Sequence, residues 1–171
     1  MTGPCFVDAD VFVYSRDPRD PRKQSLAAQW LDHLWRERQG RTSAQAMAEY
    51  YAALSRKLGM APGLAWQYVE RYFAWNPQPV DEALLRRARE IEARYRLSWW
   101  DGTIVAAAEL QGCALLLTEE LQDGAVFGAV TARSPFTLEV REAAAMYTVE
   151  RRGPPLHRPR GRPRRAAAPV A

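Results

Sequence analysis

Histidine and cysteine are scarce in this chain, and long apolar runs are absent. Its 171 residues include two His and two Cys, too few for a histidine-based zinc site or for a framework of disulfides. No uncharged apolar run approaches the roughly 20 residues of a membrane helix, and the initial MTGPCFVDAD lacks the features of a signal peptide. We therefore expect a cytoplasmic protein that makes no membrane contact, with His33 and His157 at the surface or in a tail.

Both cysteines lie inside apolar runs that are typical of buried strands. Cys5 precedes Phe6 and Val7, and Cys113 opens the run CALLLT. In a cytoplasmic protein such residues are usually reduced. We predict two core thiols, and a disulfide between adjacent strands is the alternative.

Signatures of several common enzyme classes are also missing. The chain has no G-x-x-x-x-G-K-S/T loop, no G-x-S-x-G elbow and no C-x-x-C pair. These absences leave nucleotide-cradling, serine hydrolase and dithiol redox functions without support.

Acidic and basic residues are divided unequally along the chain. Residues 1–150 hold 17 Lys and Arg and all 20 Asp and Glu, whereas residues 151–171 hold seven Arg and no acid. The last stretch also has almost no large apolar side chain, so it cannot bury enough surface to offset its ordering entropy. We predict one folded domain over residues 1–142 and a basic tail over residues 143–171, disordered from about 151. This tail is either an electrostatic arm for RNA or a solubilising extension.

Strands and helices are expected to alternate through the domain. Apolar strands are predicted at residues 5–8 and 113–118, and helices at about 21–38, from Thr42 to about 57, at 62–73, at 82–95 and from Ser98 onward. Thr42 with Gln45 forms a capping-box pattern, and Asp81 and Ser98 are further caps. Such alternation predicts an α/β fold with helices on both faces of a parallel sheet.

Four acidic residues lie where apolar runs end or helices begin. They are Asp8 in CFVDADVFVYS, Glu49 in SAQAMAEYYAALS, Asp101 in SWWDGTIVAAAEL and Glu120 in LLLTEELQDG. Ligands of open α/β sheets bind beyond the carboxyl ends of the strands, where these four can meet. Together they would form an oxygen-rich site for Mg²⁺ or Mn²⁺, the hard cations that assist phosphodiester cleavage.

Each acid also has a structural explanation. Ser98-Trp99-Trp100-Asp101 matches the S-x-x-D capping box, which favours a helix start without any chemistry. Asp8 is also a turn former, Glu49 suits a solvated helix face, and Glu120 suits a solvated loop. The coincidence of all four in one set of motifs favours a functional site.

These segments resemble, in order and spacing over about residues 4–136, the PIN-domain ribonucleases and, within them, the VapC-like toxins. The family's opening strand, its helix with a central Glu, its third acidic element and its closing stretch resemble VDADVFVYS, SAQAMAEYYAAL, SWWDGTIVAAAEL, and LLTEELQDG followed by SPF. The resemblance implies a PIN-like α/β/α sandwich with a central, mostly parallel sheet.

The same resemblance implies a function. It points to an endoribonuclease that uses Mg²⁺ or Mn²⁺ and is the toxin of a type II toxin-antitoxin pair. The catalytic and metal-binding residues would be Asp8, Glu49, Asp101 and Glu120. RNA is then the substrate and a small antitoxin protein the partner, while a homodimer is left open.

The chain departs from the family pattern at two positions. Asp10 stands where the family usually has Asn, and Glu120 stands where it usually has Asp. Asp10 adds negative charge, and Glu119 or Asp123 could replace Glu120 as the fourth acid.

The tandem tryptophans before Asp101 have two interpretations. We expect Trp99 and Trp100 in the core and in the wall of the site, and a platform for stacked bases is the alternative.

Two rival functions belong to other classes. VDADVF also matches the D-x-D-x-T/V opening of haloacid-dehalogenase-like phosphatases, in which Asp8 would be a nucleophile. Lys57 and the pair Glu119 and Glu120 are poor candidates for the other residues that such chemistry needs. The second rival is a catalytically silent PIN fold that binds RNA or a protein, and cleavage of RNA with added Mn²⁺ would separate it from the enzyme.

Overall fold

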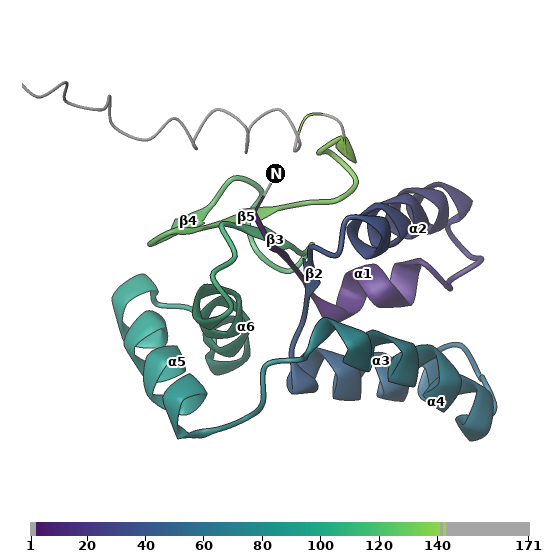
Figure 1. Ribbon diagram of the computed structural model, residues 1–171, viewed down its shortest axis with the longest axis horizontal. Coiled ribbons are helices and arrows are strands. Elements are labelled where there is room, and N and C mark those ends of the chain that lie inside the picture. The colour runs from purple at the N-terminus through teal and green to yellow at the C-terminus, as the bar shows by residue number, and fades with distance from the viewer. Residues whose placement is uncertain (1–2, 141, 143–171) are drawn as a thin grey trace, which may run out of the picture.

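The computed structural model describes residues 3–140 and 142 of the chain and has a five-stranded sheet at its centre (Figure 1). Across the sheet the strands are β2 (Gly40–Arg41), β1 (Cys5–Val7), β3 (Leu115–Leu117), β5 (Val130–Arg133) and β4 (Val126–Phe127). β1 pairs in parallel with β2 and β3, and β3 pairs in parallel with β5, while β4 runs antiparallel to β5. The predicted mostly parallel sheet is therefore confirmed.

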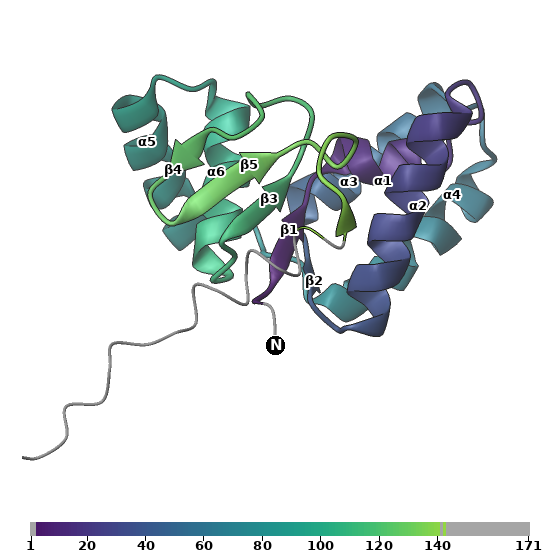
Figure 2. The same cartoon turned by 90° about the horizontal axis from the view of Figure 1, so that it is seen from above.

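Helices cover both faces of this sheet. One side carries α1 (Ala9–Tyr14), α2 (Pro21–Arg36), α3 (Ala44–Arg56), α4 (Pro62–Glu70) and the 3-10 helix η1 (Arg71–Trp75), and the other carries α5 (Glu82–Tyr95) and α6 (Trp99–Leu110). Figure 2 shows the two groups of helices on opposite sides of β1 and β3. The α/β/α sandwich and the α/β class expected from the sequence are thus confirmed.

The two central strands are buried on both faces. Cys5 and Val7 join the core under α1, α2 and α3, whereas Phe6 between them joins the core under α5 and α6. Leu116 of β3 also faces α5 and α6. Burial on both faces explains why these strands are uninterrupted apolar runs in the sequence.

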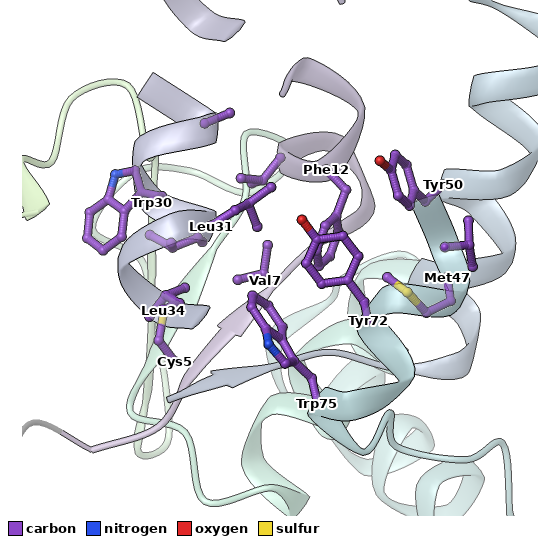
Figure 3. Packing of buried hydrophobic residues seen from close by; sticks show 14 of the residues in the cluster. Cys5, Val7, Phe12, Trp30, Leu31, Leu34, Met47, Tyr50, Tyr72 and Trp75 are labelled. Carbon is purple, nitrogen blue, oxygen red and sulfur yellow. The ribbon is translucent and has the colours of Figure 1, made fainter. Parts of the chain in front are cut away.

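Aromatic rings fill the core on the α1 side (Figure 3). The ring of Phe12 lies 5.4, 4.6 and 5.8 Å from the ring centroids of Tyr50, Tyr72 and Trp75. Strand β2 approaches this cluster so closely that a Cβ on Gly40 would lie 2.4 Å from the indole of Trp75. Glycine at this position lets the edge strand pack against the indole.

Most helix boundaries agree with the sequence, but short elements were missed. The caps Asp81 and Ser98 are confirmed at the starts of α5 and α6. The helix expected over residues 62–73 divides after Glu70 into α4 and η1. The unpredicted elements α1, β2, β4 and β5 have two to six residues each, too few to show a period.

The predicted cap of α3 was wrong by one residue. Ser43 is the N-cap, and its Oγ accepts a hydrogen bond of 3.1 Å from the N–H of Ala46. The hydroxyl of Thr42 instead donates to the carbonyl of Val7, at 3.1 Å. Thr42 therefore links the chain after β2 to the end of β1, and it does not cap the helix.

Both cysteines are free and buried, as predicted. Burial raises the pKa of Cys113 to about 12 and holds the pKa of Cys5 well above its usual value. Both side chains are therefore neutral thiols that pack as small apolar groups.

The remaining predictions concern membrane helices, the basic tail and the two histidines. No helix within residues 3–140 and 142 is both long and apolar enough to cross a membrane. The basic tail predicted at residues 143–171, including His157, lies outside the described residues. His33 is half-buried on α2.

Candidate functional site

The carboxyl ends of β1 and β3 meet at Asp8. Asp8 is the first residue after β1 and the N-cap of α1, where its Oδ1 accepts a hydrogen bond of 2.7 Å from the N–H of Ala9. Its Oδ2 accepts a hydrogen bond of 2.8 Å from the hydroxyl of Thr118, the first residue after β3. Asp8 is only 4% exposed. The first predicted acid is thus fixed in place by both of its oxygens.

A second carboxylate, Asp10, lies in the first turn of α1. Its Oδ2 accepts a hydrogen bond of 2.6 Å from the N–H of Glu119. Its Oδ1 is buried and has no partner of normal hydrogen-bond geometry in the described chain, although the N–H of Val11 is near enough to lower the pKa. Asp10 therefore ties α1 to the loop after β3 and keeps one oxygen uncommitted.

Shifted pKa values show that these acids share one electrostatic environment. Burial, and then the negative charge of Asp10, raise the pKa of Asp8 well above its usual range. Burial raises the pKa of Asp10 to about 7, with the charges of Glu120 and Glu119 adding to the shift. Ionised carboxylates in this place therefore repel one another at neutral pH.

Glu120 connects this pair to the other two predicted acids. Burial raises the pKa of Glu120, and the charges of Glu49 and Asp101 raise it further. Its own charge in turn raises the pKa of Asp8 and Asp10. The charge of Glu120 therefore interacts with the charges of Asp8, Asp10, Glu49 and Asp101.

Glu49 and Asp101 reach this environment from helices on opposite sides of the sheet. Glu49 lies in α3 with its side chain exposed, and its Oε1 accepts a hydrogen bond of 2.9 Å from Gln45. Asp101 lies in the first turn of α6. The Ser98 hydroxyl accepts from the N–H of Asp101 at 3.1 Å and donates to its Oδ2 at 2.8 Å. The capping pattern is therefore formed, and the carboxylate of Asp101 keeps an oxygen for other contacts.

Glu119, one alternative for the fourth acid, is engaged elsewhere. Its Oε2 lies 2.6 Å from the ammonium of Lys23. That ammonium also lies 4.5 and 4.9 Å from the ring centroids of Tyr14 and Phe136. The carboxylate of Glu119 thus forms an ion pair with Lys23, while its backbone holds Asp10.

Asp123, the second alternative, organises the chain after β5. Its carboxylate accepts hydrogen bonds from Arg133, from the backbone of Ser134 and from Thr137, at 2.8 to 2.9 Å. Burial alone would raise the pKa of Asp123, but these hydrogen bonds outweigh it and the pKa is lowered. The charge of Asp123 is therefore already paired with Arg133.

The carboxylates of this candidate site are suitable ligands for a hard divalent cation, but they do not converge on one point. Within residues 3–140 and 142, no three His, Cys, Asp or Glu side chains lie close enough to hold one metal ion. The set consists of carboxylate oxygens, which Mg²⁺ prefers. Burial is the main cause of the raised pKa values of Asp8, Asp10 and Glu120, and a cation would offset the repulsion that adds to them. The side chains of Glu49 and Glu120 are exposed, whereas Asp8 is buried.

The tandem tryptophans differ from each other. Trp99 is half-buried and packs against the core under α5 and α6. Trp100 is 63% exposed, so the expectation that it belongs to the core was wrong. Consecutive helical residues point in directions about 100° apart, which is why burial of Trp99 leaves Trp100 outside.

Sequence reasoning missed Thr118 and the cations beside the acids. Thr118 ends the apolar run CALLLT and is buried against Asp8, so a polar residue at a strand end was the available signal. Lys57, at the end of α3, lowers the pKa of Glu120 by its charge. Nothing in the local sequence of Lys57 or Lys23 distinguishes either from a solvated surface lysine.

The chain matches the model of a known protein family. The family model described as PIN domain matches residues 5–122 of the chain. The chain therefore belongs to the PIN-domain family, a family of nucleases that generally use divalent metal ions.

A solved structure with a similar fold comes from Mycobacterium tuberculosis. It is VapC20, described as a toxin that cleaves the sarcin-ricin loop, and it superposes with a TM-score of 0.52 at 20% sequence identity. The match covers 66% of this chain and 86% of the VapC20 chain. At 20% identity this similarity is one of fold. No curated protein sequence gives a significant match to this chain.

Proposed function

We propose that this protein is a metal-dependent endoribonuclease and the toxin of a type II toxin-antitoxin pair. The observation that carries the proposal is the position of Glu120. Burial raises its pKa, the charges of Glu49 and Asp101 raise it further, and its own charge adds to the raised pKa of Asp8. Four acids from separate segments of a PIN-domain chain therefore act on one another. The sequence motifs and the fold shared with VapC20 support the same assignment.

The roles of the acids follow from how firmly each is held. Asp8 and Asp101 are fixed at helix starts by hydrogen bonds from Thr118 and Ser98, which suits them to hold Mg²⁺ or Mn²⁺. Glu49 and Glu120 are exposed and would complete the ligand set directly or through water. Glu120 is the best fourth acid, because the alternatives Glu119 and Asp123 are already paired.

The chain's own residues would prepare RNA for cleavage. A bound divalent cation would offset phosphate charge and lower the pKa of a water molecule. Asp8, Asp101 and Glu120 would hold that cation, while Lys57 supplies positive charge beside Glu120. With water as the nucleophile, the products would be a 5′-phosphate and a 3′-hydroxyl.

A catalytically silent RNA- or protein-binding module is the second candidate. The observation in its favour is that no three potential ligands converge in the described residues. A phosphatase reading has lost its support, because the chain belongs to the PIN-domain family and Asp8 is buried with both oxygens hydrogen-bonded.

The test is RNA cleavage by the purified full chain with Mn²⁺ or Mg²⁺ and with a chelator. We expect cleavage in the presence of either metal and none with the chelator. End-group analysis should find 5′-phosphates. A protein that binds Mn²⁺ by calorimetry yet cleaves no RNA would favour the silent module. An antitoxin would be identified by a small protein that co-purifies with the chain and suppresses cleavage.

A further inference from the structure

Trp100 is the most exposed large apolar side chain in the described part of the protein, at 63%. No ring contact or cation contact of this indole occurs there, although other exposed aromatics such as Trp66 and Phe73 pack against each other. A tryptophan that stays exposed does not contribute the stabilisation that burial of its large ring would give. An isolated exposed indole therefore needs an explanation outside the core.

The backbone of Trp100 is held in the same capped turn as Asp101, one of the proposed ligands. Trp100 lies in the first turn of α6, between half-buried Trp99 and Asp101. Ser98 caps the turn through two hydrogen bonds with Asp101, and the hydroxyl of Thr103 donates to the carbonyl of Trp99 at 2.8 Å. The indole can therefore change direction only about its own two side-chain bonds, so fixing it against a ligand costs little entropy.

We propose that Trp100 is a stacking platform for an unpaired nucleobase next to the scissile phosphate. This inference rests on the proposed nuclease function and adds to it a residue that positions the substrate. A base that flanks a phosphate held at Asp101 lies within one nucleotide of the neighbouring indole. Its face is available for stacking only when it is not enclosed in a duplex.

Stacking on Trp100 matters because the site is negatively charged. Asp8, Asp10 and Glu120 repel one another, and they oppose the approach of RNA phosphates in the same way. Lys23 is already paired with Glu119. Stacking on an indole is uncharged and tolerates every base. Trp100 would therefore supply affinity that does not depend on the local charges.

Binding measurements on the full chain test the proposal. The background is the Asp8→Asn variant, in which cleavage is prevented, and the probes are a single-stranded oligoribonucleotide with internal 2-aminopurine and its duplex. Trp100→Ala should weaken single-strand binding by about 5- to 150-fold, the loss of one stacked base. Trp100→Tyr should stay within a few-fold of the parent. Fluorescence of 2-aminopurine should be quenched with Trp100 or Tyr and not with Ala.

The matched control is Trp66→Ala on α4, which removes another indole that is 46% exposed. It should leave RNA affinity unchanged, and thermal melts should show that both variants are folded. Duplex affinity and the salt dependence of binding should not change in Trp100→Ala, because no charge is lost. In the active background, Trp100→Ala should lower kcat/KM mainly through KM.

Three results would overturn the assignment. Equal single-strand affinity of the parent and Trp100→Ala, while the wild type still cleaves RNA, would remove the stacking role alone. Retained RNA affinity with lost binding of an antitoxin would assign Trp100 to a protein contact. A wild type that neither binds nor cleaves RNA with Mn²⁺ would overturn the nuclease function and this inference together.

Discussion

Replacement of Asp10 by Asn should stabilise the metal-free protein at neutral pH. The variant keeps an oxygen that can accept the hydrogen bond from the N–H of Glu119, and it removes a charge that is buried near Asp8 and Glu120. Sites built for a cation often cost stability when the cation is absent. Asp10→Asn measures that cost with the smallest change of shape.

The sign and the size follow from the pKa of Asp10, which burial raises from 3.8 to about 7. A carboxyl whose pKa is higher in the folded than in the unfolded state stabilises the fold below pH 4, and this contribution is lost as the pH rises to 7. At about 1.4 kcal/mol per unit, the loss at pH 8 is at most about 4 kcal/mol. Asp10→Asn should match the wild type near pH 4 and exceed it increasingly up to pH 7.

The assay is chemical denaturation of the full chain with chelator at several pH values between 4 and 8. Saturating Mg²⁺ or Mn²⁺ should then stabilise the wild type more than the variant, because ligands that bind only the folded state add RT ln(1 + [L]/Kd). This second measurement separates the removal of a charge from a general gain in packing.

Asp123→Asn is the matched control, since it makes the same chemical change at a carboxylate whose pKa is lowered. Asp123 accepts three hydrogen bonds and has a lowered pKa, so its replacement should destabilise the protein at neutral pH. Two results would contradict this reasoning: an Asp10→Asn variant that is less stable than the wild type at pH 8, or one whose stability falls with pH as steeply as that of the wild type. Either would show that the buried charge of Asp10 does not destabilise the metal-free protein.

Three further predictions concern activity and binding. Asp8→Asn and Asp101→Asn should each abolish metal-dependent cleavage without unfolding the protein. In Asp8→Asn the amide oxygen of the new side chain can still accept from the N–H of Ala9, and its NH2 group can donate to the hydroxyl of Thr118 in place of the bond that Asp8 accepts, while the cap of α6 is made by the backbone N–H of residue 101. Near wild-type cleavage by either variant in a gel assay would remove that residue from the site. Glu120→Asp should retain activity while Glu120→Gln weakens Mn²⁺ binding in a calorimetric titration, and equal affinities of Glu120→Gln and the wild type would exclude Glu120 as a ligand. Ending the chain at Glu150 removes seven Arg and should leave the melting temperature and saturated cleavage rate unchanged, while flattening the slope of log K against log[salt] for RNA by up to about 5; indistinguishable slopes would show that the tail does not contact RNA.

The sequence predicted the parts of the fold whose residues repeat with a clear period. The caps Asp81 and Ser98 and the apolar strands around Phe6 and Leu116 appear where the sequence placed them. Short elements such as α1 and β5 could not be predicted in the same way, because tertiary contacts fix them. Thr42 shows the limit of a local motif: its hydroxyl bonds to Val7, a residue from another strand.

The candidate acids could be named from the sequence, but their hydrogen-bond and ion-pair partners could not. Asp10 looked like an added charge, and the structure shows that it also fastens α1 to the loop at Glu119. Glu119, Glu120 and Asp123 were equivalent in the sequence. Their partners distinguish them, since Lys23 and Arg133 come from distant segments.

The position of the acidic site depends on the register of the sheet. Val7 pairs with Leu117, so the next residues, Asp8 and Thr118, meet at the same edge, and the N–H of Asp8 donates to the carbonyl of Leu117 at 3.0 Å. A slip of one residue would move Phe6 to the opposite face of the sheet and expel it from its core. The alternation of β1 between the two cores therefore fixes the register, and the register brings Asp8 to Thr118. Substitutions in this strand should disturb the acidic site even where they touch none of its carboxylates.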